Sequence, residues 1–233
     1  MKYIRNKRYF FPFRLTVAAL HTVSGMLCTY IGLERGVQFP LFLGVPLFVI
    51  GFVLFILGIV TRLTKGTALD ADIAKYTRDI ADTAKAALEL PADTAYIQEP
   101  VVLASYHYNT KDARALVKID KDGVPRTNLC LALVLLFTED TLYWYDHKFS
   151  LVFKEDRSQT MGSVKYADIK SAVLEDMKVS CETTKWNTIS VMCRNLKIDC
   201  GETTLMECFL KNNPDVDAAL AALKKLVKAA KKA

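Results

Sequence analysis

The sequence lacks the short motifs that mark the common enzyme chemistries. It contains no Gly-x-Gly-x-x-Gly, no Walker loop, no His-Glu-x-x-His and no Gly-x-Ser-x-Gly, so nucleotide, zinc-protease and serine-hydrolase chemistry have no signature in it. Its 6 cysteines show no Cys-x-x-Cys spacing, which argues against a zinc site and suits thiols kept reduced in the cytoplasm. We expect no catalytic, cofactor-binding or metal residues. An enzyme with an unfamiliar site would instead show a deep polar pocket holding perturbed ionisable groups.

Acidic and basic residues are missing from two long apolar runs, residues 15–33 and 40–61, which only residues 34–39 separate. A helix rises about 1.5 Å per residue, so each run matches a hydrocarbon core of about 30 Å. We therefore predict a transmembrane helical hairpin over residues 15–61. A signal peptide is the alternative for the first run, but that run is longer than a signal h-region and a second run follows it closely.

Positive charges flank the hairpin at its two ends and are nearly missing from its loop. The leader, residues 1–14, mixes aromatic residues with cations that we expect to contact anionic headgroups, namely Lys2, Arg5, Lys7, Arg8 and Arg14. Arg62 and Lys65 follow the second run. Because positively charged flanks stay in the cytoplasm, we predict a multi-pass protein of the cell (inner) membrane with both termini and the C-terminal domain cytoplasmic.

Small residues recur every seven positions in both apolar runs. They are Ala18, Gly25 and Gly32 in the first run and Gly44, Gly51 and Gly58 in the second. Such a stripe lets helix backbones approach closely, so we predict that the two stripes meet in a left-handed crossing near about 20°. Two alternatives stay open: glycine is common in membrane helices in general, and the stripe could mediate oligomers.

An amphipathic pattern follows the membrane hairpin and predicts a connecting helix over residues 67–90, which Pro91 ends. Its apolar stripe is thin and rich in alanine. Such a helix either packs on the domain that follows or pairs with a copy of itself as a short stalk, and we favour packing on the domain.

The remaining chain reads as short strands and a terminal helix. Strands are predicted at residues 100–108, 114–120, 129–137, 141–147, 150–154, 170–180, 188–194 and 196–200. This spacing is typical of antiparallel meanders in a sandwich or a partly open barrel. The run 129–137 is apolar on both faces, so another element must cover its outer side. Cys193 and Cys200 could be neighbours across the last hairpin, and Asn213-Pro214 predicts the start of the final helix.

The order of these elements, with the turn Tyr166-Ala-Asp168-Ile169 before a strand, resembles the pleckstrin-homology-like (PH-like) domains of bacterial membrane proteins, including GRAM-type members. The resemblance implies an antiparallel β-barrel capped by the C-terminal helix over residues 96–233. It also implies that Ile169 enters the core, that Tyr166 packs over it, and that Asp168 caps the turn. The expected fold is thus an α+β membrane protein: a transmembrane hairpin, a helix and a PH-like domain.

What the resemblance implies for function is binding, of lipid, peptide or protein. Lys111, Arg114 and Lys118 lie near the first hairpin and form a possible ligand loop, although they can equally be ordinary exposed charges. The net charge of +6 suits a protein held against an anionic bilayer and gives no sign of nucleic-acid recognition. The five lysines of the final helix complement its C-terminus or touch lipid.

We therefore expect a membrane-anchored, non-catalytic docking or regulatory module with a protein partner or a second copy of itself. The rival hypothesis is a structural subunit of a transport or secretion assembly that works through its transmembrane hairpin. A docking module needs its soluble domain to hold a partner, whereas an assembly subunit needs the hairpin.

Overall fold

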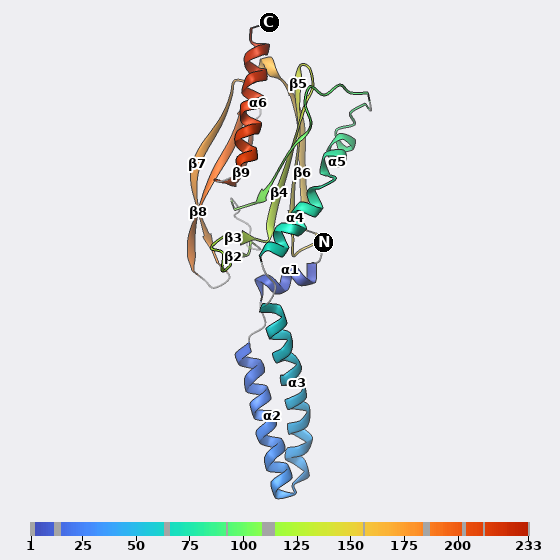
Figure 1. The fold of residues 1–233 in the computed structure, drawn as a ribbon, viewed down its shortest axis with the longest axis vertical. Helices are drawn as coiled ribbons and strands as arrows, with labels where there is room; N and C mark the ends of the chain where they lie inside the picture. Colours follow the sequence, from blue (N-terminus) through green and yellow to red (C-terminus); the bar gives the residue numbers. More distant parts are fainter. Residues whose placement is uncertain are drawn as a thin grey trace. The chain divides into compact units, whose positions relative to one another are not determined.

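A computed structural model describes residues 3–11, 15–62, 66–91, 93–108, 115–155, 157–183, 187–201, 204–211 and 213–232 (Figure 1). The chain divides into two compact units. We call Ile4–Ala68 the hairpin unit, and Leu69–Ala233 together with Met1–Tyr3 the domain unit. Each is described by itself.

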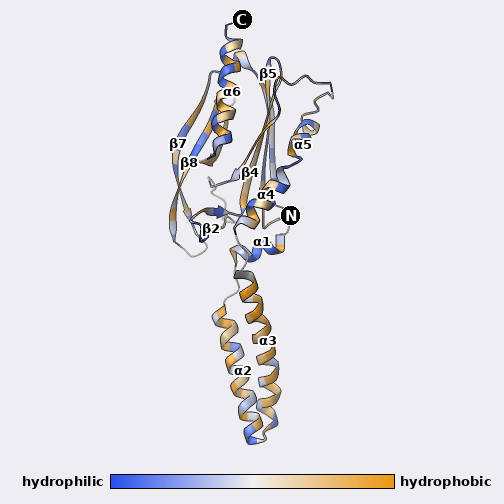
Figure 2. Cartoon of the chain, in the orientation of Figure 1, coloured by the Kyte–Doolittle hydropathy of each residue, from blue (hydrophilic) through white to orange (hydrophobic). Residues whose placement is uncertain are grey.

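The hairpin unit contains α1 (Tyr3–Phe10) from Ile4 onward, together with α2 (Leu15–Arg35) and α3 (Gln38–Arg62), while Tyr3 itself belongs to the domain unit. Both α2 and α3 are long and apolar enough to cross a membrane. In Figure 2 the ribbon of α3 is largely orange, the colour of hydrophobic residues, and that of α2 is more mixed. Each helix extends beyond its predicted run, because Glu34 and Arg35 continue α2 and α3 already begins at Gln38. Gly36 makes the tight turn between them in the left-handed region, at φ 63°.

The domain unit is built on two antiparallel sheets. The first has the order β1-β4-β5-β6 and the second β7-β8-β9, while β2 and β3 form a small hairpin. The bounds are β1 (Val101–Tyr106), β2 (Val117–Ile119), β3 (Pro125–Thr127), β4 (Leu129–Phe137), β5 (Thr141–Ser150), β6 (Arg157–Lys165), β7 (Ser171–Glu182), β8 (Thr188–Asp199) and β9 (Thr204–Leu210). The chain is thus α+β with antiparallel sheets. The described strands do not close into the expected barrel.

The core lies between the two sheets and is completed at one end by α6 (Pro214–Ala230) (Figure 1). Asn213 begins this helix as expected, since its side chain accepts a hydrogen bond of 3.1 Å from the amide of Asp215. Val216, Ala219 and Leu223 on its apolar face are buried against core residues of both sheets. Burying this face removes apolar surface from water, which is the main favourable term in the folding of such a layer.

The predicted strand over residues 129–137 forms as β4 with the same bounds, and it is buried almost throughout. Its outer face is covered by the segment that the sequence predicts as one connecting helix over residues 67–90. That segment forms two helices instead, α4 (Thr67–Thr77) and α5 (Ile80–Ala87). The break allows α5 to bury Ile80 and Ala84. From Leu69 onward these helices pack on the domain, which was the favoured alternative.

Several predicted strands are wrong. Residues 151–154 form no strand, because β5 continues to Ser150 and a turn follows. The predicted pair at 188–194 and 196–200 is the single strand β8, so Cys193 lies within this strand, Cys200 directly follows its end, and the two do not face each other across a hairpin. Strands β3, β6 and β9 have no counterpart among the predicted strands.

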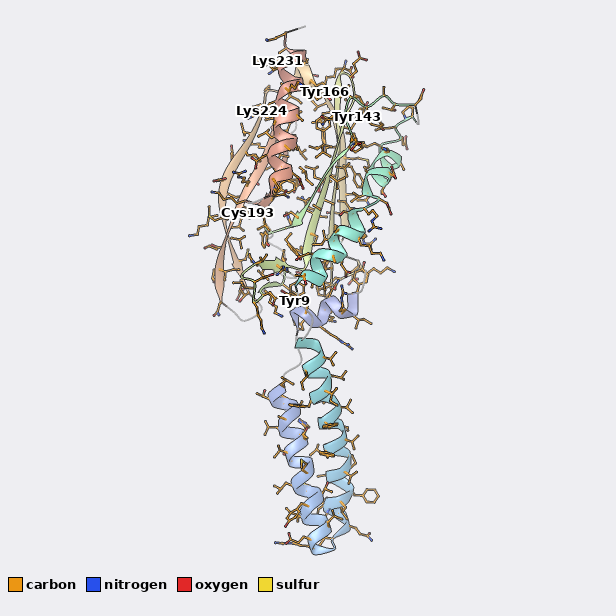
Figure 3. The ribbon with its side chains drawn as sticks, in the orientation of Figure 1. Tyr9, Tyr143, Tyr166, Cys193, Lys224 and Lys231 are labelled. Atoms are coloured by element: carbon orange, nitrogen blue, oxygen red, sulfur yellow. The ribbon has the colours of Figure 1, made fainter. Side chains whose placement is uncertain are left out.

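The turn that suggested the family resemblance is a short 3-10 helix at Tyr166–Asp168. Tyr166 and Ile169 are buried in the core as expected, and Figure 3 shows Tyr166 beside the end of the sheets. The Tyr166 hydroxyl donates a hydrogen bond of 3.0 Å to the carbonyl of Thr138. The Asp168 side chain is exposed, and its expected role in capping the turn stays a prediction.

Candidate functional site

The six small residues of the predicted seam all lie buried in the hairpin unit: Ala18, Gly25, Gly32, Gly44, Gly51 and Gly58. A Cβ added at Gly44 would lie 2.5 Å from the amide nitrogen of Thr29, and one at Gly51 would lie 2.5 Å from that of Thr22. A Cβ added at Gly25 would likewise clash with the backbone of Phe48. The two stripes therefore face each other across the α2–α3 contact, and only glycine fits there without a shift of the opposite backbone.

The polar side chains of α2 bond within the helix. Thr22 and Thr29 each donate a hydrogen bond of 2.8 Å to the carbonyl four residues earlier, and Nδ1 of His21 lies 2.7 Å from the carbonyl of Val17. The outward surface is apolar, with Phe39 and Phe42 at 76% and 84% exposure. The hairpin unit thus hides its backbone contacts and presents large apolar side chains outward.

Four of the predicted cationic residues lie in the described part of the chain. Arg5, Lys7 and Arg8 lie on α1, where Arg5 donates a hydrogen bond of 3.0 Å to the carbonyl of Ala68. Lys118 lies on β2. Lys2, Arg14, Lys111 and Arg114 fall outside the described residues, so the possible ligand loop stays a prediction.

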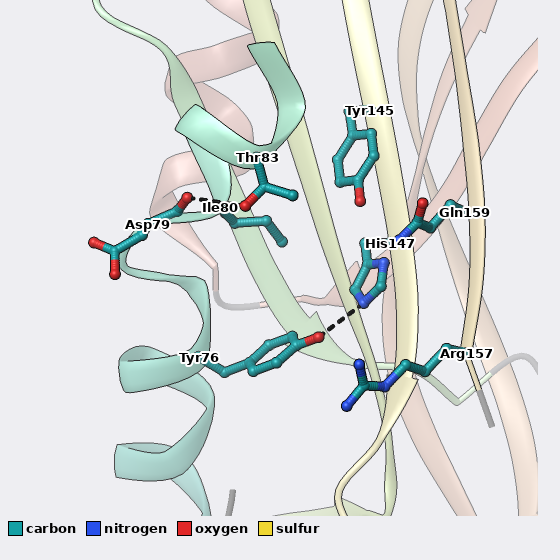
Figure 4. Close-up of a pocket in the computed structure, with 8 residues that line it drawn as sticks. All are labelled: Tyr76, Asp79, Ile80, Thr83, Tyr145, His147, Arg157 and Gln159. Atoms are coloured by element: carbon teal, nitrogen blue, oxygen red, sulfur yellow. Dashed lines mark hydrogen bonds between the residues drawn. The ribbon is translucent and has the colours of Figure 1, made fainter. Parts of the chain in front are cut away.

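A pocket of about 270 Å³ opens on the outer face of the first sheet, between that sheet and the α4–α5 segment (Figure 4). Alternation along β5 places Tyr145 and His147 on this face, and the strand register pairs His147 with Gln159 of β6. The lining residues are Tyr76, Asp79, Ile80, Thr83, Tyr145, His147, Arg157 and Gln159. No motif in the sequence singles out His147, and the pocket was not predicted.

His147 is the most constrained polar side chain of the pocket, at 4% exposure. Its Nε2 lies 3.0 Å from the Tyr76 hydroxyl, whereas its buried Nδ1 has no hydrogen-bond partner. The ring stacks on Tyr145, with centroids 6.0 Å apart and planes within 4°. Burial, and then the nearby Arg157 charge, lower the pKa of His147, so the ring is neutral at pH 7. Burial raises the pKa of Tyr76.

Arg157 supplies the positive charge of the pocket. Its guanidinium lies over the Tyr76 ring, 5.9 Å from the centroid, and Nη2 donates a hydrogen bond of 2.8 Å to the Tyr3 hydroxyl. Because a guanidinium carries five N–H donors, this bond leaves donor capacity for a ligand. The Thr83 hydroxyl donates to the carbonyl of Asp79 at 3.3 Å, and Figure 4 shows the Asp79 carboxylate pointing away from the pocket.

A second polar group lies on the inner face of the first sheet. Nζ of Lys148 is 2.7 Å from Glu207 of β9 and 3.3 Å from Asp146, and the Thr160 hydroxyl donates to Asp146 at 3.3 Å. Burial first, and then the Asp146 charge, raise the pKa of Glu207 to about 7. Oδ1 of Asp146 is buried without a partner. With two carboxylates against one ammonium, this cluster gains or loses a proton near neutral pH.

The cysteines and acidic residues provide no metal centre in the described part of the chain, where no group of three or more His, Cys, Asp and Glu is placed to hold an ion. Comparison with known protein families, with curated proteins and with solved structures found no match. The PH-like resemblance therefore stays a prediction from the sequence.

Proposed function

We propose that this chain is a membrane-anchored, non-catalytic module whose α2–α3 hairpin lies in the inner membrane and whose domain unit docks a ligand in the cytoplasm. The membrane anchor is supported by the distribution of residues in the hairpin unit, which has small residues in its interior and large apolar residues on its surface. Glycines occupy its interior contact and large apolar side chains such as Phe42 occupy its surface. That arrangement costs free energy in water and suits lipid, where small residues mediate helix packing.

The docking role is supported by the edge of the first sheet. Strand β6 is the last strand in the order β1-β4-β5-β6, and its nine residues are all exposed or half-exposed. An edge strand presents unpaired backbone N–H and C=O groups, which can pair with an extended segment of a partner. The only charged side chains of β6 are Arg157 and Lys165 at its two ends, so its middle does not repel a partner strand.

The anchor is tested by protease protection in cells that produce the full chain. Protease added outside intact cells should leave the domain unit whole, whereas protease added to inverted membrane vesicles should digest it. Digestion in intact cells would overturn the cytoplasmic assignment. Full-length protein recovered in the soluble fraction without detergent would overturn the anchor itself.

The docking role is tested by crosslinking and mass spectrometry in native membranes with two full-length variants. Met161→Lys with Ser163→Lys adds charge to the exposed middle of β6, and Gly51→Leu disturbs the hairpin seam. Docking through the domain predicts that crosslinks to a partner are lost in the first variant and kept in the second. The opposite result would favour the rival function, a structural subunit of a membrane assembly held through its hairpin.

A further inference from the structure

The pocket between β5, β6 and the α4–α5 segment has the features of a small-molecule site. We propose that it binds a small organic carboxylate with a flat apolar body, such as an arylcarboxylate. This inference goes beyond docking to a protein or a lipid and does not depend on it. Three features of the pocket carry the inference: an unpaired buried nitrogen, a cation and aromatic walls.

The unpaired nitrogen is Nδ1 of His147, which is buried and without a partner. The Tyr76 phenol is the natural donor to Nε2 across their 3.0 Å contact, and we assign the ring proton to Nδ1 on that basis. A buried N–H that lacks an acceptor is destabilising. The pocket therefore holds a donor that a ligand oxygen would satisfy, and Figure 4 shows this nitrogen on the side of Gln159.

The positive charge of Arg157 favours a ligand whose oxygen is negatively charged. Arg157 lines the pocket and lies opposite Phe149 in the strand register. Its planar guanidinium matches the two oxygens of a carboxylate. The pocket has no second cation among its lining residues. One guanidinium and one neutral imidazole balance a single negative charge better than the double charge of a phosphate.

The aromatic lining residues and the volume of the pocket favour a ligand with a small, flat apolar part. Tyr76 and Tyr145 line the pocket together with Ile80, and ring faces favour a flat apolar group. A volume of about 270 Å³ lies below the range of about 300–1,000 Å³ that holds drug-sized ligands. Of the lining hydroxyls, that of Tyr76 bonds to Nε2 of His147 and that of Thr83 bonds to a backbone carbonyl. Binding accounts for these groups without a reaction.

The test uses the full-length protein in detergent, labelled with ¹⁵N in its 3 histidines. The His147→Phe variant assigns the His147 ring signals by their loss. Sodium benzoate is titrated as the probe, with benzamide as its uncharged isostere and inorganic phosphate as an oxyanion without an apolar body. We expect benzoate to shift the His147 ring nitrogens and to leave those of His21 and His107 in place. Benzamide and phosphate should bind at least about tenfold more weakly.

Two variants on the same strand and the same face separate the pocket from general charge attraction. Arg157→Gln should weaken benzoate binding by about tenfold, while Lys165→Gln at the other end of β6 should leave it unchanged. No shift of the His147 signals at saturating benzoate would overturn the proposal, and so would equal binding of benzamide. Equal effects of the two variants, or phosphate binding as tight as benzoate, would show ordinary anion attraction and would overturn it as well.

Discussion

Arg126 of β3 and Asp70 of α4 form a two-pronged ion pair, with Nε 3.1 Å from Oδ1 and Nη2 2.8 Å from Oδ2. Arg126 is 3% exposed and also pairs with Asp122 at 2.8 Å. The Tyr106 hydroxyl donates to the same Asp70 carboxylate at 2.6 Å. A single carboxylate thus links α4 to β1 and to the small β2–β3 hairpin. Burial first, and then the hydrogen bond to Asp70, raise the pKa of Tyr106 far above its usual value.

Asp70→Asn should destabilise the domain unit by about 1–3 kcal/mol, because it leaves the buried Arg126 guanidinium with one carboxylate instead of two. Thermal unfolding of the full chain in detergent measures the effect. The matched control is Asp82→Asn on α5, whose carboxylate forms only an exposed ion pair with Lys85 at 3.3 Å, and which should cost less than about 0.5 kcal/mol. Equal losses for the two variants would contradict the role of Asp70.

Gly51→Leu should disrupt the hairpin unit, since even a Cβ at this position would lie 2.5 Å from the amide nitrogen of Thr22. Overpacking of this kind costs about 1–3 kcal/mol or more. Resistance of α2 and α3 to unfolding by sodium dodecyl sulfate, followed by circular dichroism, measures it. Val49→Leu, on an exposed position of the same helix, should behave like the parent protein. Normal folding and insertion of Gly51→Leu would refute the close packing of the seam.

The stability of the domain unit should fall as pH rises through neutrality. Glu207 has a pKa raised from 4.5 to about 7, so the folded state binds more protons than the unfolded state between these values. Its stabilising contribution is complete below pH 4.5 and is lost as pH rises through about 7. Glu207→Gln should remove this loss and raise stability at pH 8 by on the order of 1 kcal/mol.

To test this prediction, the free energy of unfolding is measured at pH 5 and at pH 8 for the parent protein and for Glu207→Gln. The change between the two pH values is then compared between the two proteins. The lowered pKa of His147 acts in the opposite sense, because it costs stability as pH falls below 6.5. That contribution is common to both proteins and cancels. Parallel pH profiles would show that Glu207 is ionised in the folded state at pH 5 and would contradict the prediction.

The buried cysteines should react slowly with a soluble thiol reagent. Cys130, Cys181, Cys193 and Cys208 are buried, so the reagent has little access to them. Burial also raises the pKa of Cys130 and of Cys181, which lowers their thiolate fraction. Cys200, which is half-buried, should react first in the domain unit. Absorbance on reaction with Ellman's reagent measures both phases, and Cys200→Ser should abolish the faster one. Rapid labelling of all six thiols in the folded protein would show an open domain.

The elements with strong apolar patterns could be predicted from the sequence. The run that forms β4 has the same bounds in the structure, and the cap at Asn213 correctly begins α6. Strand β6 was missed because its residues are mostly Ser, Gln, Thr and Gly, which suit an exposed edge and carry no apolar period. The break between α4 and α5 was missed because neither glycine nor proline marks Arg78 or Asp79.

The pocket could not be predicted, for a different reason. Tyr76, His147 and Gln159 come from three elements, and only the β5–β6 register and the packing of α4 on the sheet bring them together. The spacing of these three residues in the sequence does not predict that they come together. The predicted strand over residues 141–147 holds Tyr145 and His147, and alternation puts them on one face, but it does not say which helix covers that face.

The double burial of β4 makes the order of synthesis important. The nine residues Leu129–Phe137 carry no charge, proline or glycine, a composition that favours intermolecular β-pairing when it is exposed. The helices and strand that cover and flank β4 on one side, α4, α5 and β1, precede it in the chain, whereas β7, β8, β9 and α6 on the other side follow it. In a nascent chain that has just completed β4, one apolar face of this strand therefore stays exposed until about 90 more residues emerge. Translation adds about 5–20 residues per second. Those seconds are the period in which the growing polypeptide most needs a chaperone.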